Sequence, residues 1–351
     1  MESNFRRKML RRRIIFFTAV LVILAAVLFF NRSSVRGWYD QIAGRDYVGS
    51  GEGKVSFEIS KGETGDQIAR ALVAEGIVKN FNIVYREMIA RDAQYFPGTY
   101  SLRLKMSAAS ALDAIANPSN LQVTTVTIQE GLRIGQVLDK LATATGIPRA
   151  SFDAASTQLG NFGLPSDAVS LEGYLFPATY SFAAKSDAAA ILQTMVDRAF
   201  EELDRYGVDK ADSNRVLTLA SIIQKEARKT ADFYKVSRVF TNRLDIKMPL
   251  QSDATVSYGS GGTTVTTTDA ERAAQNGYNT YVHSGLPIGP ISTPGSLAID
   301  AALHPVAGKW LFFCAINLKT GETVFSVTGA EHAAAVAQFR AWMAANPGWN
   351  G

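Results

Sequence analysis

The longest apolar run of the chain lies near its N-terminus. Residues 14–30 read IIFFTAVLVILAAVLFF without a charge, and six Arg or Lys residues precede them within residues 1–13. As a helix this run spans about 26 Å, close to the hydrocarbon thickness of a bilayer. It is longer than the apolar region of a cleavable signal, and Asn31–Ser34 follows it instead of a small-residue cleavage site. We therefore expect a single N-terminal transmembrane helix in the cytoplasmic membrane, with residues 1–13 cytoplasmic and the remainder extracytoplasmic.

A regular pattern begins after a polar, glycine-rich linker at residues 31–53. Alternation predicts strands at Val55–Ile59 and Gly98–Leu104, and a period near 3.6 predicts helices at Thr64–Ile77, Asn82–Ala90 and Ser107–Ala116. The order strand, helix, helix, strand predicts a small α+β subdomain over residues 54–120. This order is similar to that of a LysM-like module, whose better-known members bind glycan. A plain structural packing module is the alternative.

A larger mixed region follows over residues 121–345. Strands are predicted at 121–131, 310–316 and 323–327, and helices at 134–145, 187–205, 214–229, 296–303 and 330–345. No internal repeat is visible, so this irregular order predicts a larger α+β domain rather than a repeated βα unit.

Composition and charge exclude several classes of protein. The 351 residues are 47% hydrophobic and 19% charged, which is typical of a folded chain. Residues 1–13 carry a net charge of +5, so the remainder carries −1 of the total of +4, and no nucleic-acid partner is expected. Cys314 is the only cysteine, and His283, His304 and His332 fit no metal-binding spacing. We expect neither a disulfide framework, nor a metal site, nor a cofactor.

One carboxyl group stands on the apolar side of a predicted helix. Within Val216–Lys229, Glu226 lies seven residues after Leu219, four after Ile222 and three after Ile223, near the middle of an apolar stripe. Burial there would raise its pKa, so that it keeps a proton near neutral pH and can protonate the bridging oxygen of a glycosidic bond. The alternative is a structural ion pair of Glu226 with Arg215, Arg238 or Arg243.

Four sequence blocks carry a family resemblance. They are LEGYLFPATYSF (Leu171–Phe182), LASIIQKEA (Leu219–Ala227), VFTNRLDIKMPLQSDATVSYG (Val239–Gly259) and YNTYVHSGLPIGPISTPGSLAIDAALHP (Tyr278–Pro305). In this order they strongly resemble the endolytic murein transglycosylase family, also called MltG or YceG-like, over residues 55–338.

The resemblance implies a LysM-like subdomain beside a transglycosylase catalytic domain. It implies a membrane-anchored lyase that cuts the β-1,4 bond between N-acetylmuramic acid and N-acetylglucosamine in nascent peptidoglycan. The expected product has 1,6-anhydro-N-acetylmuramic acid ends, and the cut terminates strand elongation. The expected partners are peptidoglycan glycan strands and peptidoglycan synthases. The alternative is a noncatalytic peptidoglycan-binding scaffold of the cell-wall synthesis machinery.

The family motif, similar to ASIIEKEA, has two acids that compete for the catalytic role. Here the first position is Gln224, and a glutamine cannot deliver a proton, so the resemblance assigns catalysis to Glu226. Glu172 is expected to support the site, or else to cap a local turn.

Five further residues in the family blocks are expected to bind the sugar: Asn242, Gln251, Asp253, Tyr278 and Asn279. Each has a structural alternative. Asn242 could cap its helix, Ser252 and Asp253 could form a turn, and the tyrosines could pack beneath the following Pro/Gly-rich loop.

Overall fold

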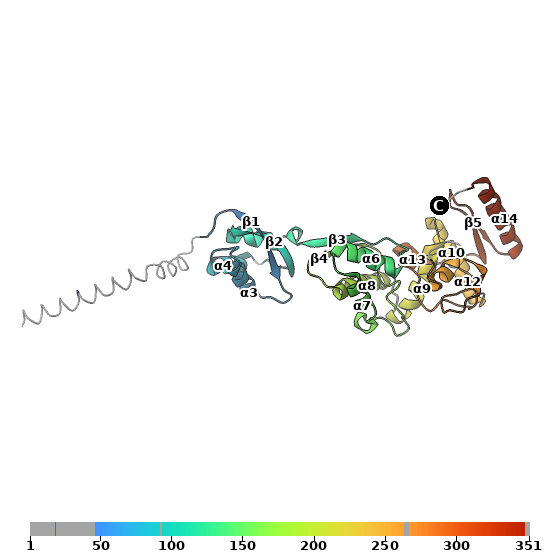
Figure 1. Ribbon diagram of the computed structural model, residues 1–351, viewed down its shortest axis with the longest axis horizontal. Helices are drawn as coiled ribbons and strands as arrows, with labels where there is room; N and C mark the ends of the chain where they lie inside the picture. The colour runs from blue at the N-terminus through green and yellow to red at the C-terminus, as the bar shows by residue number, and fades with distance from the viewer. Residues whose placement is uncertain (1–17, 19–45, 92, 263–266, 348–351) are drawn as a thin grey trace, which may run out of the picture. The chain divides into compact units, whose positions relative to one another are not determined.

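The computed structural model describes residues 18, 46–91, 93–262 and 267–347 (Figure 1). The membrane helix predicted at residues 14–30 lies outside the described residues, apart from Thr18. In the part of the chain that is described, no helix has the length and hydropathy needed to cross a bilayer. Contacts divide this part into two compact units. The first holds the described residues up to Gln122 and Ala183–Lys185, and the second holds the rest.

The first unit is a two-stranded antiparallel sheet with helices. Its elements are β1 (Ser50–Ile59), α3 (Gly65–Ala74), α4 (Phe81–Arg91), β2 (Gly98–Met106), α5 (Ala108–Ala116) and η1 (Pro118–Asn120). Phe57 of β1 faces Tyr100 of β2 in the register, and both side chains are fully buried with Leu72 of α3 and Leu112 of α5. The order of elements matches the predicted strand, helix, helix, strand. Glycan binding by this unit stays a prediction.

The second unit combines many helices with two small sheets, which agrees with the predicted α+β class (Figure 1). Its elements are β3 (Val123–Thr127), α6 (Ile134–Thr145), α7 (Arg149–Ser156), η2 (Leu159–Phe162), β4 (Thr179–Ala183), α8 (Ala188–Arg205), η3 (Lys210–Asp212), α9 (Ser213–Glu226), α10 (Thr230–Asp245), α11 (Asp253–Gly259), α12 (Asp269–Ala273), α13 (Ser296–Leu303), β5 (Phe312–Asn317), β6 (Glu322–Ser326) and α14 (Gly329–Ala345). β3 pairs with β4, and β5 pairs with β6.

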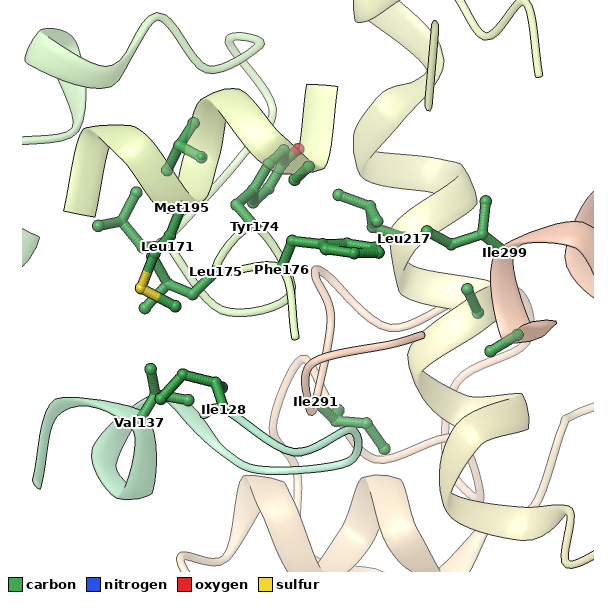
Figure 2. Packing of buried hydrophobic residues seen from close by; sticks show 14 of the residues in the cluster. Ile128, Val137, Leu171, Tyr174, Leu175, Phe176, Met195, Leu217, Ile291 and Ile299 are labelled. Atoms are coloured by element: carbon green, nitrogen blue, oxygen red, sulfur yellow. The ribbon is translucent and has the colours of Figure 1, made fainter. Parts of the chain in front are cut away.

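Helix α9 runs through the core of this unit. It packs against α10, α11 and α13, and Figure 2 shows the ring of Phe176 directed toward Leu217 of α9, with Ile299 of α13 beside the same helix. The predicted apolar stripe is buried, but so are the polar side chains of Thr218 and Ser221. The prediction of a single buried stripe was therefore too narrow, because neighbours cover α9 on several sides.

The end of α9 differs from the prediction. The helix was expected to reach Lys229 but ends at Glu226, where Ala227 turns extended (φ −84°, ψ 138°). Neither Gly nor Pro marks this end, and α10 begins at Thr230 and packs back on α9. No helix range was predicted for α10, although its buried Phe233 and Phe240 have helical spacing. Packing between the two helices, rather than a local stop signal, sets the break.

The C-terminal elements form a hairpin covered by a helix. β5 and β6 are antiparallel with Phe313 opposite Phe325, and Gly321 takes the positive φ of the connecting turn. α14 packs on both strands and begins with a capping box between Thr328 and Glu331. Both strands lie within two residues of their predicted bounds.

Candidate active site

A cavity of about 350 Å³ opens beside the last turn of α9. Its wall is formed by Glu226 of α9, Phe240 and Arg243 of α10, the loop residues Leu250, Gln251 and Ser252, Asp253 of α11, Tyr281, Phe312 and Phe313 of β5, and His332 of α14. Segments separated by more than one hundred residues therefore meet around Glu226.

Among the residues that the structure describes, Glu226 has one hydrogen-bond partner on the cavity wall. The Ser252 hydroxyl donates to Glu226 Oε1 at 2.5 Å. The residue is partly buried, and the loss of hydration raises the pKa of its carboxyl above the ordinary value, helped by the negative charge of Asp253. The Ser252 hydrogen bond and the charge of Lys225 act in the opposite direction. Its place in the last helical turn, at the negative end of the helix dipole, also disfavours ionisation.

The structural ion pair considered for Glu226 does not form. Among the described residues, Arg215 pairs with Asp212, and the guanidinium groups of Arg238 and Arg243 donate to backbone carbonyls. Glu226 is therefore a carboxyl group of raised pKa without an arginine partner, as a general acid requires.

A strained loop orients the Ser252 hydroxyl toward Glu226. Gln251 has φ +50°, a left-handed conformation that costs a non-glycine residue about 1–2 kcal/mol. Its N–H donates to the Thr280 carbonyl at 3.0 Å, and the Ser252 N–H donates to Thr280 Oγ1 at 3.1 Å. These bonds hold the loop in place, while the exposed Gln251 side chain lines the cavity. Its contact with a sugar stays a prediction.

Asp253 lies on the wall but is tied into its own network. Its Oδ1 accepts hydrogen bonds from Thr267 Oγ1 (2.5 Å), Tyr281 Oη (3.0 Å) and Arg272 Nε (3.3 Å). The carboxylate is thus fixed against the cavity and neutralised by Arg272. This arrangement suits positioning of a ligand better than nucleophilic attack, which needs a free carboxylate.

The YNTY segment contributes differently from the prediction. Tyr281 lines the cavity, whereas the ring of Tyr278 packs on Tyr258 with centroids 4.7 Å apart. Asn279 is fully buried, and its amide donates to the carbonyls of Glu271, Arg272 and Ala274. Its Oδ1 accepts the Tyr281 N–H at 3.0 Å. Direct sugar contact by Asn279 is corrected to a positioning role, because every polar atom of its side chain already has a protein partner.

Asn242 also lies apart from the cavity wall. Its amide donates to the carbonyls of Gly308 (3.2 Å) and Trp310 (2.8 Å), which joins α10 to the segment before β5. These contacts are structural, as the alternative for Asn242 expected. The side chain, however, joins two segments instead of capping its helix.

Glu172 belongs to a second buried cluster. Its side chain is 1% exposed, and its two carboxylate oxygens accept the Ile134 N–H at 3.0 and 2.9 Å, at the start of α6. Tyr258 donates a further hydrogen bond. Burial nevertheless raises the pKa of Glu172 to about 7, against the lowering effects of these donors and of Arg133. Glu172 therefore caps the start of α6 and does not line the cavity, and its support of the site stays a prediction.

Lys225 connects the two clusters electrostatically. Its Nζ donates to the Gly131 carbonyl at 3.2 Å, and its charge acts on both Glu172 and Glu226. Lost hydration and the charge of Arg133 lower the pKa of Lys225. Sequence reasoning missed Lys225, Ser252 and Tyr281 as members of the site. Ser252 and Tyr281 lie inside the QSD and YNTY runs of the family blocks, and this position could have identified them.

Comparison with known proteins places this geometry in a family. The YceG-like family model matches residues 57–338 of the chain, which includes α9 and every residue lining the cavity. The chain belongs to the YceG-like family. This match confirms the family membership that the four sequence blocks predicted.

Curated relatives of this YceG-like chain carry the name of an enzyme. This chain is 29% identical over 299 residues to the endolytic murein transglycosylase of Bacillus subtilis strain 168, and the match covers 79% of this chain and 82% of the relative. It is 27% identical over 316 residues to that of Streptococcus pneumoniae strain D39, covering 79% of this chain and 56% of the relative. A 2.6 Å crystal structure of a YceG-like protein from Listeria monocytogenes aligns with TM-score 0.54 and 28% identity, over 81% of this chain and 99% of the other.

Gln224 lies two residues before Glu226 on α9 of this YceG-like protein. Its amide oxygen accepts the N–H of Gly295, the N-cap of α13, at 3.0 Å. Gln224 is therefore engaged with the core, and Glu226 is the carboxyl that α9 contributes to the cavity wall.

Proposed function

We propose that this chain is a lytic transglycosylase that cleaves within the glycan strands of nascent peptidoglycan, with Glu226 as acid and then base. The observation that carries the proposal is the carboxyl of raised pKa on the wall of a cavity, bonded to Ser252 and without an arginine partner. The names of the curated relatives, endolytic murein transglycosylase, support the same reaction and substrate.

The proposed reaction needs one carboxyl group. The Ser252 bond occupies Oε1 and leaves Oε2 of Glu226 to hold the proton. Glu226 gives this proton to the oxygen that bridges N-acetylmuramic acid and N-acetylglucosamine, and the bond from C1 to that oxygen breaks. The C6 hydroxyl oxygen of the same muramic acid then bonds to C1, and the Glu226 carboxylate takes the hydroxyl proton. No water is consumed, the product ends in the 1,6-anhydro sugar, and Glu226 returns to its starting form.

The place of the reaction is part of the proposal. The cationic residues 1–13 and the apolar run at 14–30 support a single anchor in the cytoplasmic membrane, with the catalytic unit outside the cytoplasm. The linker at residues 31–53 would keep the cavity near the bilayer, where new glycan emerges. Cleavage there would terminate strand elongation and bring the enzyme close to peptidoglycan synthases.

Fragment analysis separates this proposal from a noncatalytic glycan-binding scaffold. The purified full chain is incubated with un-crosslinked glycan strands, and the products are analysed by mass spectrometry. We expect internal fragments lighter than the hydrolysis products by one water. Glycan binding without release of such fragments would instead favour the scaffold.

Ser252→Ala is expected to change the pH dependence of cleavage. The hydroxyl lowers the pKa of Glu226, so its removal raises that pKa further. Activity needs the protonated acid and falls as pH rises through this pKa, so the alkaline limb of kcat/KM moves to higher pH in the variant.

The matched control is Ser260→Ala, at the other end of α11. Ser260 is exposed, and its hydroxyl bonds Ser257 and Glu271 rather than a residue of the cavity wall. Its pH profile should coincide with that of the wild type. An alkaline limb that stays in place, or moves to lower pH, in Ser252→Ala would contradict the assigned role.

A further inference from the structure

The cavity wall contains a buried cation without an anionic partner. Arg243 is 7% exposed, its Nε donates to the Leu311 carbonyl at 2.6 Å, and its Nη1 donates to the carbonyls of Leu250 (2.8 Å) and Pro249 (3.3 Å). Among the described residues, no carboxylate forms an ion pair with Arg243, and its Nη2 has no hydrogen-bond partner. Buried charges are normally paired with an opposite charge, so we expect this guanidinium to bind an anion.

The surroundings of Arg243 strengthen its attraction for an anion. Its guanidinium lies over the Phe312 ring, 5.2 Å from the centroid, and the same ring stacks on His332 with centroids 5.1 Å apart. Phe240 and Phe313 complete an apolar wall. An electrostatic interaction is stronger beside such rings than in water, because the local dielectric is lower. Burial and the charge of Arg243 also lower the pKa of His332, which keeps the imidazole neutral near pH 7.

Neither carboxyl group of the cavity wall, Glu226 or Asp253, forms an ion pair with Arg243. Glu226 is bonded by Ser252, and its proposed role needs the protonated form. Asp253 is paired with Arg272 and bonded by Thr267 and Tyr281. The missing anion must therefore come from a ligand that enters the cavity.

We infer that Arg243 binds a carboxylate of the glycan strand through Nη2, beside His332, and so makes carboxylate-bearing strands the preferred substrate. The inference rests on the proposed function, because it assigns the ligand of the same cavity. Two carboxylates of peptidoglycan have this chemistry: the lactyl group of a muramic acid without peptide, and the free carboxylates of an attached peptide. Arginine suits either one, since its guanidinium stays charged when buried and its N–H groups match a carboxylate.

The test compares strands that differ only in charge. The purified full chain is given un-crosslinked strands with free lactyl carboxylates, the same strands with these groups converted to methylamides, peptide-bearing strands, and peptide-bearing strands with amidated carboxylates. We expect the KM to rise by about 10- to 100-fold when the recognised carboxylate is neutralised, as a lost hydrogen bond to a charged group predicts. The kcat should change less. The pair of strands that shows the effect identifies the source of the carboxylate.

Two arginine variants on α10 refine the comparison. In Arg243→Gln the ratio of KM values for neutral and charged strands should fall toward one, and Arg243→Lys, which keeps the charge, should retain part of the preference. The matched control is Arg238→Gln, because Arg238 also donates to backbone carbonyls, those of Pro305 and Val306, but lies outside the cavity wall. This control should retain the full wild-type ratio.

The outcomes separate this inference from the function on which it rests. Equal KM values of the wild type for charged and neutral strands, with release of anhydro-ended fragments, would overturn the inference alone. An unchanged ratio in a folded Arg243→Gln variant would do the same. Failure of the wild type to release anhydro-ended fragments from any strand would contradict the proposed function itself. The wild-type comparison decides the matter even if Arg243→Gln does not fold.

Discussion

Glu226→Gln is expected to lower the rate of release of anhydro-ended fragments by about 100- to 10,000-fold, the range measured for removal of a general acid or base. Glutamine fills the same space and keeps an oxygen that can accept the Ser252 hydrogen bond, so the fold and glycan binding should persist. It cannot deliver a proton to the bridging oxygen. Fragment release is measured by mass spectrometry, and strand binding by co-sedimentation with un-crosslinked glycan.

The sharpest control exchanges Gln224 and Glu226 of the α9 motif. The double variant Gln224→Glu, Glu226→Gln has the composition of the wild type but carries its carboxyl two positions earlier, where the side chain faces the Gly295 N–H. It should be as inactive as Glu226→Gln, while Gln224→Glu alone should retain activity. Equal fragment release by the wild type and Glu226→Gln would remove Glu226 from the mechanism.

Glu172→Gln should gain about 3 kcal/mol of unfolding free energy relative to the wild type as pH rises from 4.5 to 7. Burial raises the pKa of Glu172 to about 7, while an unfolded glutamate has a pKa near 4.5. Between these values the native state holds more protons than the unfolded state, so the free energy of unfolding contributed by this group falls as pH rises. The full effect is reached above pH 7 and is absent below pH 4.5.

The measurement is chemical denaturation of the full chain at several pH values between 4 and 8. Glutamine keeps an oxygen for the Ile134 N–H but has no charge to bury, so the variant should gain stability relative to the wild type as pH rises. Glu271→Gln is the matched control. Glu271 is a partly exposed helix-capping carboxylate whose pKa is lowered by Thr268, so its stabilising effect is lost only below pH 4.5. A constant difference between Glu172→Gln and the wild type across this range would contradict the prediction.

Glu226 and Glu172 show how much of the site could be predicted from sequence. The spacing of Glu226 from Leu219 and Ile223 predicted a carboxyl on the buried side of its helix, and the structure places Glu226 partly buried on the cavity wall. The importance of Glu172 was suggested by its family block, but its partner Ile134 lies 38 residues earlier in the chain. Periodicity predicts which face of a helix is buried. It does not predict which polar groups from other segments will meet that face.

The sugar-binding residues illustrate the same limit. Gln251 and Asp253 line the cavity, whereas Asn279 is buried and Asn242 joins two segments elsewhere. All four are polar residues in family blocks, so residue type and motif could not separate cavity contacts from structural hydrogen bonds. The difference depends on the backbone carbonyls that happen to lie nearby, and the positions of those carbonyls are set by packing of distant segments.

Residue pattern and motifs were enough for the α+β class, for the positions of helices α6, α8, α13 and α14, and for the family, and they predicted Glu226 as the acid of α9. These properties depend on local periodicity, residue chemistry and contiguous motifs, which can be read along the chain. Only packing decided that α9 ends at Glu226, that Thr280 holds the Ser252 loop against it, and that Arg243 lines the cavity with no carboxylate paired to it among the described residues. These features depend on contacts between segments far apart in the chain, and only the packed backbone sets such distances.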